Sequence, residues 1–349
     1  MKKFTWKRWL IVVATIILFL FGVVGGINYA VDPFWCFNHG AFIGKFQPMF
    51  DERQQKTNWL TFHDVDIDTV ILGNSRVTYL DTRDVPGKAF NYAASSMRPS
   101  EFPDYLAYAA KRSESEITTV ILGVSFVGGT SGSVNADFDS PQAYINRANS
   151  LGFRFRNLLN LRLLKYSIQC VKRERENDFN NCYVRQGNVV LSRQMMLPIP
   201  KKSLEKVLAE QISLYAASAY GKNYRYVSNI HLYEEMQKAF PDVRFVVFIT
   251  PVTHNLLSLL VQQGLLEDYK KWVADLVSHF EEVWNFMYPN AVTGNNDYFK
   301  DAHHYSPEVA RWIAQKIMGM PYQGPQDFGV KVNKQNLAEH LDFLNTMYP

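Results

Sequence analysis

Val70-Ile71-Leu72-Gly73-Asn74-Ser75-Arg76 is the stretch on which the fold and the candidate site of this chain depend. Its first three residues are apolar and rich in β-branched side chains, which predicts a buried strand. Gly73-Asn74-Ser75 then supplies small polar residues suited to a tight turn from the strand into a helix. Such a turn can present the Ser75 hydroxyl at the mouth of a cleft, whereas a structural serine would cap the following helix.

Strands and helices alternate on both sides of this stretch, as is typical of α/β proteins. Continuous apolar strands indicate a parallel sheet that is covered on both faces. The expected strands are Thr69–Gly73, Ala89–Tyr92, Thr118–Gly123, Val243–Thr250 and Val283–Met287, and the expected helices are Pro99–Lys111, Val227–Phe240, Leu265–Phe280 and Pro307–Met318.

An uncharged stretch from Trp9 to Tyr29 follows a short N-terminal segment, residues 1–8, that contains four basic residues. Since about 20 helical residues cross a hydrocarbon core of about 30 Å, this stretch is long enough to span a membrane. It exceeds the apolar region of a signal peptide, about 7 to 15 residues, and no convincing cleavage site follows, so we expect an uncleaved anchor. The basic residues place the N-terminus in the cytoplasm. The expected location is therefore the cell membrane, with a single span and an extracytoplasmic domain.

The sheet-forming sequence is interrupted between residues 126 and 226, where no convincing strand is found and three helices are expected. We interpret this segment as a helical insertion that begins with a flexible loop, Gly128–Ser133. It follows the carboxyl end of a strand, beside the edge where open α/β sheets bind ligands, and is either a lid or substrate platform or structural cover. The main domain spans residues 69–319. An aromatic juxtamembrane segment, residues 30–68, precedes it, and a C-terminal extension with one short helix, residues 320–349, follows.

The composition limits the classes of partner and cofactor. The 349 residues are 47% hydrophobic, which is enough for one large core and a subdomain. The formal charge of +4 is distributed over both signs, so nucleic acid is not an expected partner. Cys170 and Cys182 are close enough in sequence for a disulfide in an oxidising compartment, which leaves Cys36 over. The spacings indicate no metal site, and we expect no cofactor.

The loops after parallel strands meet at one edge of a sheet, which would bring two distant segments together. The first segment carries Ser75, and the second, which contains Asp301, His303 and His304, precedes the last helix. Serine becomes a nucleophile when a histidine accepts its proton, and a carboxylate orients that imidazole. We therefore expect Ser75 as nucleophile, His304 as base and Asp301 as the orienting carboxylate, with His303 as the alternative base.

Gly73-Asn74-Ser75 at the end of the first strand and Asp301-x-x-His304 before the last helix resemble the SGNH (GDSL-like) hydrolase superfamily. The chain is most similar to its membrane-anchored, extracytoplasmic branch, which includes alginate O-acetylation proteins and the D-alanyl transfer protein of teichoic-acid modification. The Asp32-Pro33 pair after the anchor is also similar to that branch. The resemblance covers residues 69–318. It implies a flavodoxin-like three-layer α/β/α sandwich and a Ser75, His304, Asp301 triad.

The middle motifs of the superfamily differ in this chain. The second should offer a glycine amide to the oxyanion, and residues 91–96 contain small residues but no glycine. The third should read Gly-x-Asn, and here Ser125 takes the place of the asparagine. Oxyanion stabilisation would then use the backbone amide of Ser75, with Ser125, Asn91 and Asn74 as further candidates.

Two further residues are candidates for binding substrate. His254 follows the fourth expected strand and would contact substrate or a leaving group, or else is a partly buried loop histidine. Arg76, next to the nucleophile, would hold an anionic group or lie at the surface.

The resemblance implies a function in polysaccharide modification. The resembling branch commonly works with a multi-spanning membrane-bound O-acyltransferase, so the resemblance implies such a partner for this chain. The first hypothesis is therefore an extracytoplasmic O-acyltransferase that modifies a cell-surface or secreted polysaccharide through an acyl-Ser75 intermediate. A carbohydrate esterase would use the same acyl-enzyme with water as acceptor. The alternative from another class is a non-catalytic assembly subunit of a polysaccharide-modification complex.

Overall fold

The computed structural model describes residues 6–127, 138–186, 189–221 and 224–347. The chain forms two compact units, one from residues 1–64 and 142–191 and one from residues 65–141 and 192–349. The Gly128–Ser133 loop that was expected to open the insertion lies outside the described residues. Each unit is described below by itself.

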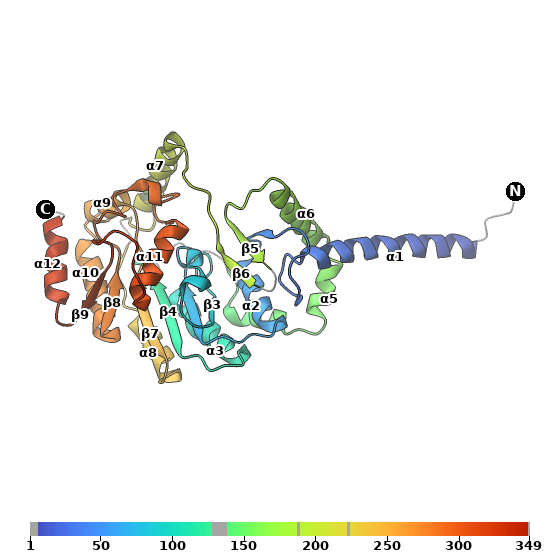
Figure 1. The fold of residues 1–349 in the computed structure, drawn as a ribbon, viewed down its shortest axis with the longest axis horizontal. Coiled ribbons are helices and arrows are strands. Elements are labelled where there is room, and N and C mark those ends of the chain that lie inside the picture. The colour runs from blue at the N-terminus through green and yellow to red at the C-terminus, as the bar shows by residue number, and fades with distance from the viewer. Residues whose placement is uncertain (1–5, 128–137, 187–188, 222–223, 348–349) are drawn as a thin grey trace. The chain divides into compact units, whose positions relative to one another are not determined.

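The first unit begins with α1 (Trp6–Val31), one uninterrupted helix that is long and apolar enough to span a membrane (Figure 1). It contains the whole of the expected span. Helices α5 (Phe153–Leu158) and α6 (Leu161–Arg175) contact α1. The unit also holds α2 (Glu52–Phe62), α4 (Pro141–Ala148) and a three-stranded sheet in the order β1 (Phe46–Pro48), β5 (Cys182–Gln186), β6 (Val189–Arg193).

The interpretation of residues 126–226 as a purely helical insertion was wrong. Strands β5 and β6 lie within it, and residues 142–191 belong to the same unit as the N-terminal 64 residues. The strand β5 was missed because its sequence, Cys-Tyr-Val-Arg-Gln, lacks a continuous apolar run; its antiparallel pairing with β1 is a long-range contact. Helix α2 gives no amphipathic signal either. Its residues from Glu52 to Leu60 are mostly polar and are all buried, so no apolar face alternates with a polar one.

Asp32, directly after α1, has a structural role in the first unit. Its carboxylate accepts hydrogen bonds from the backbone N–H groups of Cys36 at 2.8 Å and Phe37 at 3.1 Å. It also pairs with Arg185 on β5 at 2.9 Å, and both side chains are almost fully buried. Removing one partner of such a pair would leave an uncompensated buried charge.

The three cysteines are buried free thiols.

The second unit is an α/β domain around a mixed, mostly parallel sheet. The strand order is β3-β2-β4-β7-β8-β9, and all neighbours are parallel except β8 and β9. The bounds are β2 Thr69–Gly73, β3 Ala89–Asn91, β4 Thr119–Val124, β7 Arg244–Ile249, β8 Glu282–Asn285 and β9 Val330–Asn333. The five expected strands are confirmed within one or two residues at each end. The C-terminal extension adds the antiparallel strand β9 and α12 (Leu337–Met347), so it completes the sheet as well as adding a helix.

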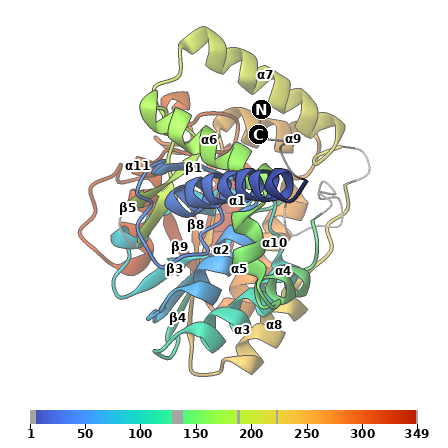
Figure 2. The same cartoon turned by 90° about the vertical axis from the view of Figure 1, so that its right-hand side faces the viewer.

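The helices of the second unit gather in contacting groups. Helix α8 (Ile230–Ala239) contacts both α3 (Phe102–Arg112) and α10 (Leu266–Phe280), and Figure 2 shows α3 beside α8. Helix α7 (Lys201–Ala217) lies beside α9 (His254–Gln262) in the same view. The short helices are η1 (Val77–Tyr79), η2 (Thr82–Asp84), η3 (Pro99–Glu101) and η4 (Asn296–Tyr298).

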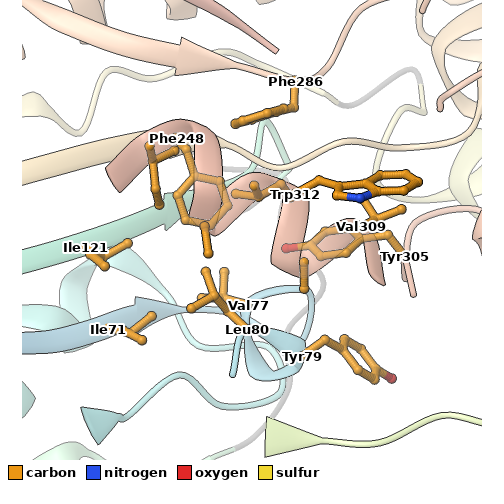
Figure 3. Close-up of a cluster of buried hydrophobic side chains, with 14 of the residues drawn as sticks. Ile71, Val77, Tyr79, Leu80, Ile121, Phe248, Phe286, Tyr305, Val309 and Trp312 are labelled. Atoms are coloured by element: carbon orange, nitrogen blue, oxygen red, sulfur yellow. The ribbon is translucent and has the colours of Figure 1, made fainter. Parts of the chain in front are cut away.

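A buried cluster joins the sheet to α11 (Pro307–Met318) and to η1 (Figure 3). Ile71 and Ile121 occupy paired positions on β2 and β4, and both contribute to the cluster. Val77 of η1 packs into the same cluster over Gly73 and Gly123, where a Cβ atom would lie 2.4 Å and 2.3 Å from its Cγ2. Glycine at these two positions lets the segment after Ser75 pack directly on the strand ends.

Candidate active site

Ser75 lies in the turn between β2 and η1. Its Oγ is 2.9 Å from Nε2 of His304, and its carbonyl accepts a hydrogen bond from the Thr78 hydroxyl at 2.7 Å. The Ser75 side chain is thus directed to the histidine and does not cap η1. The structure brings the two segments singled out in the sequence, which are 229 residues apart, to one point.

Asp301 completes the chain of hydrogen bonds. Its Oδ2 is 2.7 Å from Nδ1 of His304, and its Oδ1 accepts the backbone N–H groups of His303 at 3.0 Å and His304 at 2.8 Å. Asp301 is buried and His304 is 13% exposed at its side chain. A carboxylate on Nδ1 fixes the tautomer in which Nε2 is free to accept the serine proton.

The backbone around Asp301 is held from several sides. Phe299 and Tyr305 form an antiparallel bridge, and the Lys300 N–H donates to the His304 carbonyl at 3.0 Å. The Ala302 carbonyl accepts from the backbone N–H of Thr253 at 3.0 Å and from its hydroxyl at 3.1 Å. The segment from Asp301 to His304 is therefore a braced loop, so the hydrogen-bonded geometry is preorganised.

The electrostatic setting favours an ionised aspartate and a neutral histidine. Burial by itself would raise the pKa of Asp301, but the charge and hydrogen bond of His304 outweigh it and hold that pKa well below its usual range. Burial lowers the pKa of His304, and Asp301 opposes this effect only in part. Burial, followed by the charge of Arg193, lowers the pKa of Lys300 to about 8. At neutral pH the imidazole is thus unprotonated, as a general base must be.

Of the residues expected to stabilise an oxyanion, Ser75, Asn74 and Ser125 lie at one pocket and Asn91 lies elsewhere. The Ser75 backbone N–H has no hydrogen-bond acceptor among the described residues, so it is available to an oxyanion. Asn74 donates from Nδ2 to the Ser125 hydroxyl at 2.7 Å, and both residues line a pocket beside Ser75. Asn91 does not belong to the site: its amide donates to the carbonyls of Val77 and Leu80, each at 2.9 Å. Asn91 therefore fixes η1 to the end of β3.

The pocket beside Ser75 is lined by ten residues: Asn74, Ser75, Arg76, Ser96, Met97, Arg98, Ser125, Val127, Tyr215 and His303. Arg76 is 3% exposed and donates to the hydroxyls of Thr250 and Tyr215, each at 3.2 Å. Among the residues that the structure describes, no carboxylate forms a salt bridge with Arg76. A buried guanidinium with neutral partners is a ready binding group for an anion.

His254 lies outside this pocket. It is the first residue of α9, is exposed, and has its Nε2 3.3 Å from the hydroxyl of Ser258. The expectation of a loop at this point was wrong, because Thr253 is the N-cap of α9 and His254 is already its first helical residue. His254 is therefore not among the residues that the structure brings together.

Tyr215 and Lys300 are site residues that the sequence analysis missed. The Tyr215 hydroxyl lies between Arg76 and Nδ1 of His303, each at 3.2 Å, and no motif marks this position in α7. Lys300 precedes Asp301 directly and lies 3.4 Å from the Tyr79 hydroxyl; its place beside the Asp301 motif was an available signal. Nδ1 of His303 lies 3.2 Å from the Tyr215 hydroxyl, and it is His304 whose Nε2 lies 2.9 Å from Ser75 Oγ.

Asp301, His303 and His304 also satisfy the distance criterion for a metal site, since one ligand atom from each lies within 4.8 Å of the others. However, both ring nitrogens of His304 are engaged, one by Asp301 and one by Ser75. A metal ion would have to displace one of these hydrogen bonds. The donor set thus fits proton transfer better than metal coordination.

Comparisons with known proteins add no identification. A scan of the chain against protein-family models finds no match, and a search of curated proteins finds none.

Proposed function

We propose that this chain is an extracytoplasmic O-acyltransferase that modifies a cell-surface or secreted polysaccharide through an acyl-Ser75 intermediate. The observation that carries the proposal is the continuous chain of hydrogen bonds from Asp301 through His304 to Ser75. This arrangement has the roles and distances of a serine nucleophile with its base and orienting carboxylate.

In the first half of the reaction, Ser75 Oγ attacks the carbonyl carbon of an acyl donor, and its proton passes to Nε2 of His304. The Ser75 N–H stabilises the negative charge that develops on the carbonyl oxygen. Collapse of the tetrahedral intermediate expels the donor alcohol, which takes the proton from His304. The products of this half are acyl-Ser75 and the free alcohol.

In the second half, an acceptor hydroxyl gives its proton to Nε2 of His304 and attacks the acyl carbon. The bond to Ser75 Oγ then breaks, and the serine recovers the proton from His304. A sugar hydroxyl as acceptor gives transfer, and water gives the esterase reaction. The charge of Asp301 stabilises the imidazolium in both halves.

Two larger features support the proposed family. Numbered among themselves, the five parallel strands have the order 2-1-3-4-5, which is the flavodoxin-like order. The site lies after the carboxyl ends of β2 and β4, where such sheets bind ligands. Helix α1 would anchor the domain beside a multi-spanning membrane-bound O-acyltransferase that supplies the acyl group.

Arg76 supports an anionic substrate. Its guanidinium lines the pocket, lacks a carboxylate partner among the described residues and is held in place by Thr250 and Tyr215. A carboxylate or phosphate on the donor or acceptor would supply the missing negative charge.

The full chain, purified in detergent, tests the chemistry. We expect a serine-directed fluorophosphonate to label it and a chromogenic acetyl ester to be hydrolysed. Ser75→Ala should abolish labelling and reduce turnover by about 10⁴-fold or more, and Asp301→Asn should reduce turnover by about 10⁴-fold. Ser203→Ala, an exposed serine on α7, is the control and should behave as the wild type. Wild-type protein that is neither labelled nor active would favour the non-catalytic assembly role.

The same preparation separates transfer from hydrolysis and tests Arg76. With excess oligosaccharide, acylated sugar detected by mass spectrometry would support transfer, and free acid alone would support the esterase. Arg76→Gln should raise KM for anionic oligosaccharides by about 10- to 100-fold, as expected for a lost charged hydrogen bond. Its KM for neutral oligosaccharides should stay near that of the wild type, and an equal change for both would contradict the anionic assignment.

A further inference from the structure

The exposed part of α1 is close in length to the thickness of the hydrocarbon core of a bilayer. Nearly every side chain from Trp6 to Val23 is exposed, and coverage by the rest of the unit begins at Val24. Eighteen helical residues measure about 27 Å, close to the hydrocarbon thickness of about 30 Å. If this exposed part spans the membrane, the first elements that contact α1 lie at the level of the lipid headgroups.

Those elements are α5 and α6. A Cβ atom at Gly25 would lie 3.6 Å from Cδ2 of Leu159, so Leu159 is level with Gly25. Three residues later, the Asn28 amide donates to the carbonyls of Leu158 at 2.8 Å and Asn160 at 3.2 Å, and it accepts from the Ser167 hydroxyl at 2.9 Å. The junction of α5 and α6 is thus fixed to α1 by polar contacts, directly beyond the exposed segment.

This junction exposes large apolar side chains. Leu151, Phe155, Leu159 and Leu161 are 96%, 57%, 50% and 70% exposed. The first three are four residues apart in sequence, and Leu161 begins α6 beside them. Exposed apolar side chains gathered in one short segment mark an interaction surface.

Basic side chains accompany this apolar group. Residues 153–165 contain four basic residues and no acidic one. Arg156, Arg162 and Lys165 are exposed, and no described carboxylate forms a salt bridge with them. Apolar side chains next to unpaired cations are the combination found in segments that lie in the interface of an anionic membrane.

We propose that the α5–α6 junction, defined by Leu151, Phe155, Leu159, Leu161, Arg156, Arg162 and Lys165, is a docking surface for the anionic headgroup layer of the bilayer. The apolar side chains enter the boundary between headgroups and acyl chains, and the three cations contact lipid phosphates. A bilayer explains the features together, because the junction packs on α1 directly beyond an exposed apolar part whose length is close to the thickness of one hydrocarbon core. The surface holds the first unit against the membrane independently of the chemistry at Ser75.

Spin labelling of the full chain in nanodiscs tests this proposal. The three native cysteines are buried, so Leu161→Cys provides the reactive thiol. In nanodiscs with about 30% anionic lipid, we expect the label to collide with dissolved oxygen more than with a water-soluble nickel complex. Asn146→Cys, at an exposed polar position on α4, is the control and should show the opposite preference. A label at residue 161 that is as accessible to nickel as the control would overturn the proposal.

The lipid charge and the cations provide a second test. Replacing Arg156, Arg162 and Lys165 with glutamine should abolish the difference in label depth between anionic and purely zwitterionic nanodiscs. A difference that persists in this triple variant would contradict the role of the cations. A label that is shielded from both oxygen and nickel would indicate a protein partner on this surface and would also overturn the proposal.

Discussion

Opposing influences set the pKa of His304 at the scale of single residues. Burial lowers this pKa, Asp301 raises it, and the charges of Lys300 and Arg193 lower it again. Lys300 is itself charged below its own pKa of about 8, so it is cationic where His304 titrates. The His304 imidazole therefore remains unprotonated at a more acidic pH than that of an ordinary histidine, whose pKa is about 6.5.

This balance predicts the pH dependence of turnover. Only neutral His304 accepts the serine proton, so kcat/KM should fall on the acid side as pH drops through the pKa of His304, below 6.5. Lys300→Met removes a positive charge that disfavours the imidazolium, so the pKa of His304 rises and the acid limb moves to higher pH. Lys300→Arg keeps the charge and should leave the limb near that of the wild type. Profiles of kcat/KM from pH 4 to 9 measure this, and a limb unmoved in Lys300→Met would refute the electrostatic role.

At the scale of elements, the contact between β4 and η1 positions Ser75. A Cβ atom at Gly123 would lie 2.3 Å from Val77 Cγ2 and 2.7 Å from Phe248 Cζ. Val77 comes two residues after Ser75, so any displacement of η1 also displaces the serine from His304.

We therefore expect Gly123→Ala to affect stability and activity together. Overpacking of this kind costs about 1 to 3 kcal/mol of unfolding free energy. Fluorophosphonate labelling should also slow, because the 2.9 Å contact between Ser75 and His304 is lengthened. Gly26→Ala is the matched control, since a Cβ atom there meets no other atom within 4 Å. Thermal denaturation and labelling rates measure both effects, and a Gly123→Ala protein indistinguishable from the control would contradict this account.

At the scale of the whole molecule, α1 and the basic residues before it predict the topology of the chain. In spheroplasts of a bacterial host, external protease should remove a C-terminal tag and leave an N-terminal tag protected, because the basic segment stays in the cytoplasm. Salt should not extract the protein from membranes, whereas detergent should, as for a helix that spans the bilayer. Immunoblots against the two tags provide the measurement. Protection of the C-terminal tag would place the site at Ser75 on the cytoplasmic side.

The sequence by itself determined those elements whose structure depends on residues close together in the chain. The apolar runs specified the parallel strands, because strands buried on both faces need continuous apolar side chains. The Asp301 to His304 spacing specified the hydrogen bond between these two side chains, because both lie within one short segment, whereas the contact of His304 with Ser75, 229 residues away, depends on the fold. The long uncharged stretch specified α1.

Only the tertiary structure decided the parts that depend on distant partners. Strand β5 forms because β1 pairs with it, and α2 is buried all round, so neither shows the pattern of an isolated element. Asn91 is a site candidate in the sequence because residues 91–96 stand where the resembled superfamily has its second motif, but its amide donates to the carbonyls of Val77 and Leu80 at η1. Tyr215 reaches the pocket from α7, and no sequence motif near it indicates this role. Such roles arise from contacts between residues far apart in the chain, which a local pattern does not encode.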